Sequence, residues 1–248
     1  MKMDVSIMSK KKYKLEFHVH TATSHDSILS KYFLFFMCKF KKIDCIAITD
    51  HNEITGALKY KSFFEKHDIS VIVGEEIFTK DGEIIGLYLN KKIDPMLSVE
   101  QTIEEIKKQN GFVYIPHPYD KKRYKTVLKF DLVKKYCKSI DFIECHNGRN
   151  ISEDYSIKQN QIAEELKLRK IVGSDAHTFY EIGRNCCLVN SFEKNKLKNE
   201  IENAIFIKKK CIKFCHFNTK VARVINMIKG GKWNELSRCI NKKISKSK

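Results

Sequence analysis

The chain is poor in the residues that interrupt folded domains. Three prolines and ten glycines are spread over 248 residues, and no stretch is rich in either. A flexible linker between domains needs such a stretch. We find no internal repeat and no low-complexity block, and the length suits one α/β domain with a modest appendage. A solenoid and a string of small domains are therefore excluded.

Long apolar segments are missing as well. No run of about 18 uncharged apolar residues, the length that spans a bilayer, occurs in the chain. Residues 1–12 lack the apolar stretch of a signal peptide. The apolar run at residues 33–38 is too short to span, so we expect it to form a buried helix face. These absences favour a cytoplasmic protein with no transmembrane segment.

Disulfide bonds are not expected. The nine cysteines are odd in number, and several fall inside predicted strands or helices, where small buried thiols are common. Reduced thiols are the simplest interpretation. Cys211 and Cys215, four residues apart, together with His216 resemble part of a metal site, but no second cysteine pair completes the pattern.

Arginine is scarce, with 6 residues against 41 lysines, yet the net charge is +17. Residues 207–248 carry 13 of these cations and one acid, Glu235. Such a basic tail attracts polyanions, and its amphipathic stretch at residues 221–228 could pack on the main domain or on an acidic membrane. A general lysine bias explains part of the charge, and the tail has few aromatic side chains to stack on bases. Nucleic-acid contact through the tail is one alternative.

Five short clusters of metal-binding side chains are the main positive signal. They are His18-Val19-His20, Asp50-His51, Gly74-Glu75-Glu76, Pro116-His117-Pro118 and Ser174-Asp175-Ala176-His177. Imidazole and carboxylate groups hold divalent transition metals in proteins. Each cluster follows a short apolar run rich in β-branched residues, which is typical of a buried strand. These runs are residues 14–17, 43–49, 70–73, 111–115 and 170–173, and a sixth strand is expected at 139–143.

Helical segments alternate with these strands. We expect helices at residues 30–41, 55–66, 98–109, 152–168 and 193–205. Ser98 opens a capping box, and Ser152 is a candidate cap. Alternation of strands and helices predicts a parallel sheet, and ligands at the carboxyl ends of its strands predict a barrel with its site at one mouth.

The five motifs, in this order and context, resemble those of the PHP (polymerase and histidinol phosphatase) family over roughly Tyr13 to Ile205. The resemblance implies a distorted (β/α)7 barrel with a metal site at the carboxyl ends of its strands. It also implies phosphoester hydrolysis with two or three divalent ions, with zinc, manganese and iron equally suited to these ligands. We expect a phosphoesterase domain at residues 13–206 and a basic, helical C-terminal extension at residues 207–248.

Matching the family motifs residue by residue predicts the metal ligands His18, His20, Asp26, His51, Glu76, His117, Asp175 and His177. The family spacing selects Glu76 over Glu75, which should point the other way along the strand. Eight ligands suffice for two or three ions that share bridging carboxylates. Open questions are whether His25, Asp50 and His146 join the site, and whether Glu83 replaces a histidine that some family members have.

The resemblance also implies the chemistry. A hydroxide activated by the metal ions would attack the phosphate, so no nucleophilic side chain is required. Glu76, Asp175 and His177 are the predicted catalytic residues. Arg123, Arg149 and Arg184 follow site-forming segments and are candidates for binding phosphate, because guanidinium matches phosphate geometry. Glu144, His146 and Asn147 are candidates to line the mouth.

Three functions remain open from the sequence. The favoured one is hydrolysis of a small phosphomonoester. The first alternative is an exonuclease, or a phosphoesterase for nucleoside bisphosphates and short oligonucleotides. The second is a metal-stabilised module without catalytic activity. Deletion of residues 207–248 is expected to harm only a nuclease, and binding to a long polyanion should weaken steeply as salt rises.

Overall fold

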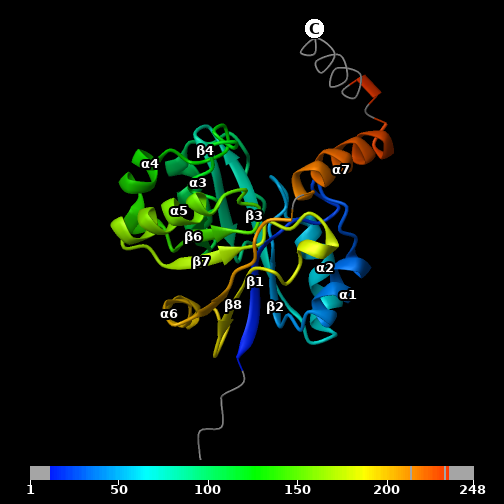
Figure 1. The fold of residues 1–248 in the computed structure, drawn as a ribbon, viewed down its shortest axis with the longest axis horizontal. Helices are drawn as coiled ribbons and strands as arrows, with labels where there is room; N and C mark the ends of the chain where they lie inside the picture. Colours follow the sequence, from blue (N-terminus) through cyan, green and yellow to red (C-terminus); the bar gives the residue numbers. More distant parts are fainter. Residues whose placement is uncertain (1–11, 213, 232, 235–248) are drawn as a thin grey trace, which may run out of the picture.

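A single curved sheet organises the protein (Figure 1). The computed structural model describes residues 12–212, 214–231 and 233–234. Within them nine strands form one sheet in the order β7-β6-β5-β4-β3-β2-β1-β8-β9. The strands are β1 (Tyr13–Val19), β2 (Cys45–Ile48), β3 (Ser70–Thr79), β4 (Gly82–Leu87), β5 (Phe112–Ile115), β6 (Phe142–Asn147), β7 (Lys170–Gly173), β8 (Cys186–Val189) and β9 (Ile205–Ile207).

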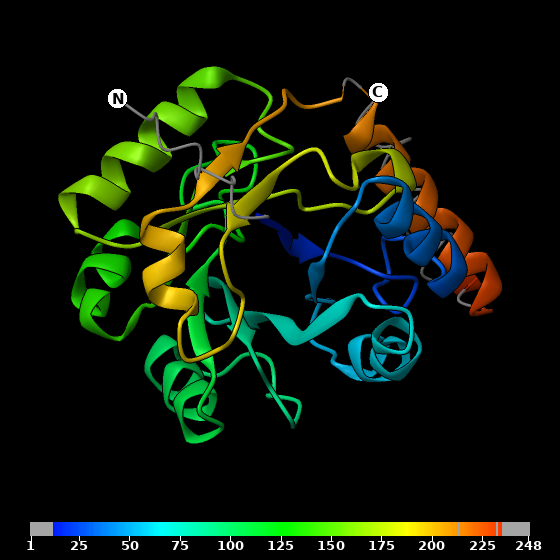
Figure 2. The same cartoon turned by 90° about the horizontal axis from the view of Figure 1, so that it is seen from below.

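Helices surround the sheet, with β1 near the centre when the molecule is seen from below (Figure 2). They are α1 (Lys31–Phe40), α2 (Thr55–Glu65), α3 (Val99–Lys108), α4 (Phe130–Lys135), α5 (Glu153–Glu165), α6 (Leu197–Glu202) and α7 (Cys215–Lys229). Two short 3₁₀ turns, η1 (Cys137–Ser139) and η2 (Phe179–Glu181), complete the set in the described part of the chain. α1, α2 and α5 each connect two parallel strands, as in a barrel of alternating strands and helices.

The sheet closes almost completely on itself. Ala176, which follows β7, bridges to Val19 of β1 in parallel fashion. The His20 amide donates to the Ala176 carbonyl at 2.9 Å, and the Ala176 amide donates to the His18 carbonyl at 3.2 Å. These two bonds bring the carboxyl ends of β1 and β7 together, which is where the predicted ligands lie.

The predicted α/β barrel-like fold is confirmed, but its strands do not follow seven plain strand–helix repeats. β3 and β4 form an antiparallel hairpin, and β4 also pairs with β5 in antiparallel fashion. β8 pairs antiparallel with both β1 and β9. β9 (Ile205–Ile207) crosses the predicted domain boundary between residues 206 and 207. The division of the chain into a phosphoesterase domain and an extension stays a prediction.

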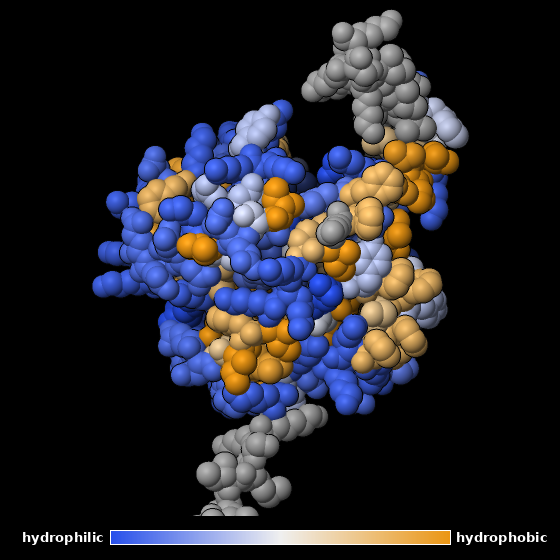
Figure 3. All heavy atoms as spheres, viewed as in Figure 1, coloured by the Kyte–Doolittle hydropathy of each residue, from blue (hydrophilic) through white to orange (hydrophobic). Residues whose placement is uncertain are grey.

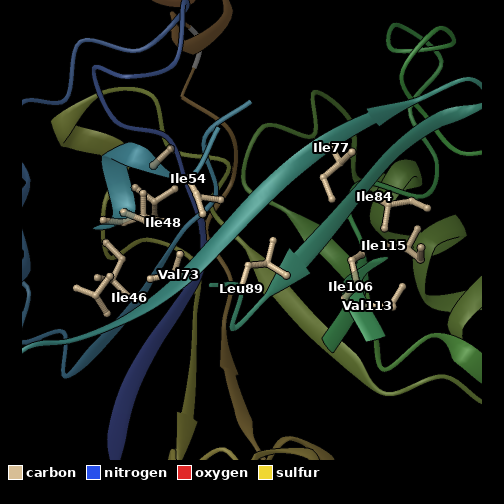
Figure 4. Packing of buried hydrophobic residues seen from close by; sticks show 14 of the residues in the cluster. Ile46, Ile48, Ile54, Val73, Ile77, Ile84, Leu89, Ile106, Val113 and Ile115 are labelled. Carbon is tan, nitrogen blue, oxygen red and sulfur yellow. The ribbon is translucent and has the colours of Figure 1, made fainter. Parts of the chain in front are cut away.

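Both faces of the sheet are buried, which explains the apolar runs in the sequence. In β2, Ile46 and Ile48 pack in the cluster that lies under the helices, whereas Cys45 and Ala47 pack inside the barrel. Figure 4 shows part of the helix-facing cluster, with residues from β2, β3, β4 and β5. Burying each large aliphatic side chain contributes about 1.5–3 kcal/mol. The core therefore holds the strand ends in place.

The helix caps predicted from sequence are confirmed. Ser98 accepts a bond from the Gln101 amide and forms the full capping box with the Gln101 side chain. Ser152 accepts from the Asp154 amide at the start of α5. The last predicted helix is shorter than expected, since α6 spans only Leu197–Glu202.

The structure corrects the prediction for the apolar run at residues 33–38. We expected a buried helix face, but only Leu34, Met37 and Cys38 are buried in α1. Phe33 and Phe36 are more than 60% exposed. Six consecutive residues go around a helix of 3.6 residues per turn, so they cannot all face the core. Apolar surface consequently gathers over α1 and α7 on the face shown in Figure 3.

The length of β3 also differs from expectation. We expected a strand that ends at Val73, directly before the Gly74-Glu75-Glu76 motif, but β3 continues to Thr79. The hairpin with β4 explains the extension, because β4 satisfies the backbone groups of residues 74–79. Glu76 therefore projects from within a strand, which gives its carboxylate a rigid support.

Candidate metal centre

The structure brings all eight predicted ligands together at the mouth of the barrel. His18 lies in β1 and Glu76 in β3, and the other six lie in the loops that follow β1, β2, β5 and β7. Seven of the eight are buried, with side-chain exposure of 3% or less, and His51 is 17% exposed. Backbone positions with positive φ at His117 (29°) and Asp175 (52°) turn these loops inward.

The Glu76 carboxylate lies at the centre of the group. Its Oε1 is 3.0 Å from His117 Nε2 and 3.5 Å from His18 Nε2. Its Oε2 is 3.1 Å from His51 Nδ1 and 3.3 Å from His20 Nε2. Both oxygens of this one carboxylate therefore face imidazoles, and carboxylate and imidazole are the side chains that hold divalent metal ions in proteins.

A second group forms around Asp26 and Asp175. Asp26 Oδ1 is 3.3 Å from His177 Nε2, and Asp26 Oδ2 is 3.6 Å from His51 Nε2. Asp175 Oδ1 lies 3.6 Å from His20 Nε2 and 3.8 Å from His18 Nε2. The two groups share imidazoles, so the eight side chains form one continuous cluster.

Three imidazoles are held by their outer nitrogen. His18 Nδ1 is 2.7 Å from Glu144 Oε1, His20 Nδ1 is 3.3 Å from Ser24 Oγ, and His177 Nδ1 is 2.8 Å from the Asp175 carbonyl. In each case Nε2 faces the cluster. Metal-binding histidines have this arrangement, because the outer partner sets the tautomer and the ring orientation.

Glu144 is itself firmly held. It accepts bonds from the His117 amide at 2.6 Å, from Asn147 Nδ2 at 2.8 Å and from the Tyr114 hydroxyl. Gly173 leaves room for it, since a Cβ there would lie 1.9 Å from Glu144 Oε1. Glu144 therefore connects β1, β5 and β7 behind the cluster. The sequence predicted that Glu144 lines the mouth of the barrel, but it did not predict that Glu144 holds the His18 ring.

Divalent ions fit these residues. Three overlapping groups each have ligand atoms within 4.8 Å of one another: His20, His51 and His177; His18, His20 and Glu76; and His51, Glu76 and Glu83. The buried Asp26 Oδ1 makes no hydrogen bond, and neither does His117 Nδ1. Neutral imidazole and carboxylate are ordinary ligands of zinc, manganese and iron.

The surroundings keep the Glu76 and Asp175 carboxylates ionised. Burial alone raises a carboxyl pKa, but His18 and His51 hold the pKa of Glu76 well below its usual range. Burial also raises the pKa of Asp175, yet Arg123 and His18 hold that pKa well below its usual range. Burial lowers the pKa of His51, and the Glu76 and Asp26 carboxylates overcome this and raise it to about 10. The site therefore has strongly negative oxygens facing basic nitrogens.

Residues that the sequence left open fall in different places. Asp50 accepts from the Thr21 amide, the Thr21 hydroxyl and the Ser24 hydroxyl, so it orders the loop after β1. Glu83 joins the cluster, 3.5 Å from His117 Nε2 and 3.9 Å from His51 Nδ1. His25 is largely exposed beside Asp26. His146 bonds to Ser156 and to the Lys209 carbonyl, outside the cluster.

A cavity of about 530 Å³ opens onto the cluster. Asp26, His51, Glu83, Asp175 and His177 form its metal-facing wall. Six cations from three segments also line the cavity: Lys122, Arg123, Lys125, Arg149, Lys220 and Arg223. The cavity is thus suited to an anion placed against the metal-binding side chains.

The three predicted arginines differ in position. Arg123 reaches Asp175 Oδ2 at 2.5 Å and lies at the cluster. Arg149 lines the cavity but forms a bidentate pair with Glu181, at 2.8 and 3.2 Å. Arg184 does not line the cavity, and its Nη2 donates to the Lys210 carbonyl at 3.0 Å.

Sequence reasoning missed the part that α7 plays at the mouth. Arg223 Nη2 donates to Asp26 Oδ2 at 2.9 Å. Asn226 Nδ2 lies 3.0–3.3 Å from the carbonyls of Ser24, His25 and Ser27. Lys220, Arg223 and Asn226 repeat every three residues on one helix face, which is the signal that the sequence offered. Residue 26 and residue 223 are too far apart in the chain for that signal to name a partner.

Fold and site together define an α/β barrel-like protein with a buried histidine and carboxylate centre at its mouth. The family model of the PHP domain matches residues 16–173. The chain therefore belongs to the PHP domain family, as its motifs predicted.

Two relatives are similar in sequence to part of this chain. The uncharacterized protein MJ0417 of Methanocaldococcus jannaschii is 33% identical over 172 residues, which is 68% of each chain. The uncharacterized protein MJ1587 of the same organism is 40% identical over 116 residues, which is 43% of this chain and 68% of the relative.

Solved structures share the fold. One is a two-domain protein of Bacteroides vulgatus described as containing a predicted PHP-like metal-dependent phosphoesterase, with TM-score 0.65 and 18% identity. The alignment covers 80% of this chain and 65% of that protein, so this chain spans about two thirds of its length. PsfC of Pseudomonas syringae has TM-score 0.59 and 13% identity over 87% and 98% of the two chains. Within the described residues, no helix is both long and apolar enough to cross a membrane.

Proposed function

We propose that this protein is a metal-dependent phosphoesterase that hydrolyses a small phosphomonoester at a centre of two or three divalent ions. The observation that carries the proposal is the convergence of five imidazoles and three carboxylates in one cluster, with Glu76 facing four of the imidazoles. Four of these eight side chains line the cavity. Membership of the PHP family and PHP-like neighbours described as phosphoesterases support the same activity.

His18, His20, Asp26, His51, Glu76, His117, Asp175 and His177 would hold the ions, and Glu83 adds a further carboxylate. Bound divalent ions supply Lewis acidity and lower the pKa of water, which provides the nucleophile without a nucleophilic side chain. Glu144, Ser24 and the Asp175 carbonyl orient the imidazoles toward this position. The roles of Glu76, Asp175 and His177 in catalysis follow from their central place in the cluster.

The side chains around the cavity would place the phosphate. Arg123 pairs with both Asp175 and Asp120 and so stands beside the ligands, where a guanidinium can reach phosphoryl oxygens. Glu181 holds Arg149 in a fixed orientation at the cavity wall. We retain Arg123 and Arg149 as phosphate-binding residues. Arg184, which bonds to Lys210, is the weakest of the three candidates.

A second candidate is a phosphoesterase for nucleoside bisphosphates or short oligonucleotides. Its supporting observation is the set of further cations that line the cavity, with Lys122 and Lys125 in the segment after β5 and Lys220 and Arg223 in α7. Such a wall can hold a second phosphate. The volume of about 530 Å³ suits a small molecule or the end of a chain, not a duplex.

We also propose that residues 207–248 are an extension that helps to form the site. Within the described residues, α7 buries Cys215, Thr219 and Ala222 and contacts the loop that carries Asp26. The basic residues 213, 232, 238, 242, 243, 246 and 248 lie outside the described residues, so nucleic-acid contact through them stays a prediction.

The decisive experiment is hydrolysis by metal-loaded protein of an aryl phosphomonoester, a nucleoside bisphosphate and 5′-labelled oligonucleotides, beside an Asp175→Ala control. Turnover of the monoester that the control lacks would support the first proposal. Release from the bisphosphate or oligonucleotides alone would select the second candidate. Silence on every substrate, with bound metal verified, would refute both and leave a module without catalytic activity.

A further inference from the structure

Three metal-binding side chains outside the cluster meet where the chain enters α7. Cys211 precedes the helix, Cys215 is its first residue and His216 its second. The two Sγ atoms are 3.0 Å apart, and one ligand atom from each residue lies within 4.8 Å of the others. Cys215 is buried, whereas Cys211 and His216 are half-buried. The proposed hydrolysis uses none of the three.

The His216 ring is oriented as a metal ligand. Its Nε2 lies 3.1 Å from the Arg149 carbonyl oxygen, which can only accept, so Nε2 carries the proton. The other ring nitrogen of the neutral imidazole then carries a lone pair, and the Cys215 thiol lies within hydrogen-bonding reach of the ring. Metal-binding histidines commonly donate their second N–H to a backbone carbonyl in this way.

The two thiols are close enough to share an ion. Two sulfur atoms at about 2.3 Å from one tetrahedral zinc ion lie about 3.8 Å apart, whereas a disulfide bond is about 2.05 Å long. The observed 3.0 Å lies between these values. Cys211 lies outside helix and strand, so a small rotation of its side chain would open the pair. In the described part of the chain, no other two thiols are in hydrogen-bonding contact.

We propose that Cys211, Cys215 and His216 bind one thiophilic divalent ion, such as zinc, separately from the ions of the barrel centre. Two thiolates and a neutral imidazole balance the ionic charge, so the neighbouring Arg149 is no obstacle. A water molecule would complete the tetrahedron. This proposal stands on its own geometry and does not depend on the proposed hydrolysis.

The position of this site gives it a role. It lies at the first turn of α7, and Arg223 and Asn226 of the same helix hold the loop of Asp26 at the other end. The Arg149 carbonyl that binds His216 belongs to the residue whose guanidinium lines the cavity. An ion at Cys211, Cys215 and His216 would therefore fix the start of α7 against the barrel and keep the helix over the mouth.

Cobalt binding tests the site directly in the reduced, metal-stripped full chain. Cobalt bound to cysteine gives intense thiolate-to-metal charge-transfer absorption, and we expect one such chromophore per chain, removed by added zinc. The double variant Cys211→Ser/Cys215→Ser should lose the band. Glu76→Gln should keep it, because the barrel centre offers only nitrogen and oxygen ligands. Cys137→Ser and Cys239→Ser are the matched controls and should also keep it.

Several outcomes would overturn the proposal. The band could persist in the double variant, be absent in the unaltered chain, or disappear in the Cys239→Ser control. An added small-molecule disulfide could also oxidise the two thiols to a disulfide bond while cobalt produces no band. That result would make the pair a dithiol and not a metal site. Failure of hydrolysis would leave the cobalt result unaffected, so the two proposals fail separately.

Amide hydrogen exchange tests the effect on α7. Zinc should slow exchange in the first turns of α7 by at least about tenfold in the unaltered chain and leave the double serine variant unchanged. Circular dichroism of the double variant establishes that it is folded. Equal exchange with and without zinc in the unaltered chain would refute the anchoring role.

Discussion

At the scale of single residues, two adjacent glutamates show how the alternation of side chains along a strand decides which of them can reach the cluster. Successive side chains of β3 point to opposite faces, so Glu76 faces the cluster and Glu75 faces away. Glu75 Oε2 instead accepts from the Ile93 amide at 2.9 Å. Burial raises the pKa of Glu75 to about 7. The pair therefore offers a ligand and a matched control in neighbouring positions.

Glu76→Gln should remove both metal and activity. The amide loses the charge that faces four imidazoles, and loss of a central ligand should exceed the 10- to 100-fold effect of outer partners. We expect hydrolysis to fall by at least about 100-fold, with less bound metal by elemental analysis. Glu75→Gln should retain both within a few-fold. Full activity in Glu76→Gln would refute the site assignment.

Arg123→Ala should reduce the stabilisation of the transition state for phosphoester hydrolysis. A hydrogen bond to a charged group contributes about 1.5–3 kcal/mol, which corresponds to roughly 10- to 150-fold in kcat/KM. Arg169 is the control, since it pairs with Glu202 at 2.7 Å and does not line the cavity. Equal kcat/KM values for Arg123→Ala and Arg169→Ala would show that Arg123 serves only to pair with Asp175.

At the scale of elements, α7 changes an expectation drawn from the sequence. Deletion of residues 207–248 was expected to harm only a nuclease. The contacts of Arg223 with Asp26, and of Asn226 with the loop of residues 24–27, give α7 a part in ordering a predicted metal ligand. We now expect the deletion to reduce hydrolysis of every substrate, small monoesters included.

A single substitution tests that contact. Asn226→Ala removes the amide that lies near three loop carbonyls, and each net hydrogen bond contributes about 0.5–1.5 kcal/mol. We expect the free energy of unfolding to fall by about 1–3 kcal/mol, with weaker metal binding by calorimetry. Asn203→Ala is the control, because its side chain bonds only to the Asn199 carbonyl one turn earlier. Identical metal affinity in both variants would exclude a role for α7 at the centre.

At the scale of the whole molecule, the metal centre and the stability of the fold are coupled. Nearly all the predicted ligands are buried and come from strands and loops that are far apart in sequence, so the unfolded chain cannot present the same site. A ligand that binds only the native state stabilises it by about 2.7 kcal/mol at 100 times its Kd.

Chelation should therefore lower the melting temperature of the loaded protein, and added metal should restore it. In Glu76→Gln the shift should be much smaller, because a carboxylate predicted to bind the ions is missing. Thermal unfolding with and without chelator measures both. An unchanged melting temperature, with metal content shown to fall, would mean that the ions do not contribute to folding.

The sequence by itself indicated the alternation of strands and helices, and it predicted eight metal ligands whose side chains the structure brings together. Short apolar β-branched runs, caps such as Ser98 and Ser152, and histidines or carboxylates near strand ends are local patterns, and local patterns can be read from adjacent residues. The order of five motifs then indicated the family, and the match to residues 16–173 confirmed it.

Only the tertiary structure decided how distant side chains pair. Glu144 orients His18 across 126 residues, and Arg223 reaches Asp26 across 197. The sequence analysis likewise did not predict the antiparallel strand β4 or the exposed face of α1. These features depend on which surfaces meet when the barrel closes. Burial, charge pairing and sheet partners are properties of the packed molecule, because a given side chain has no fixed environment until the rest of the chain surrounds it.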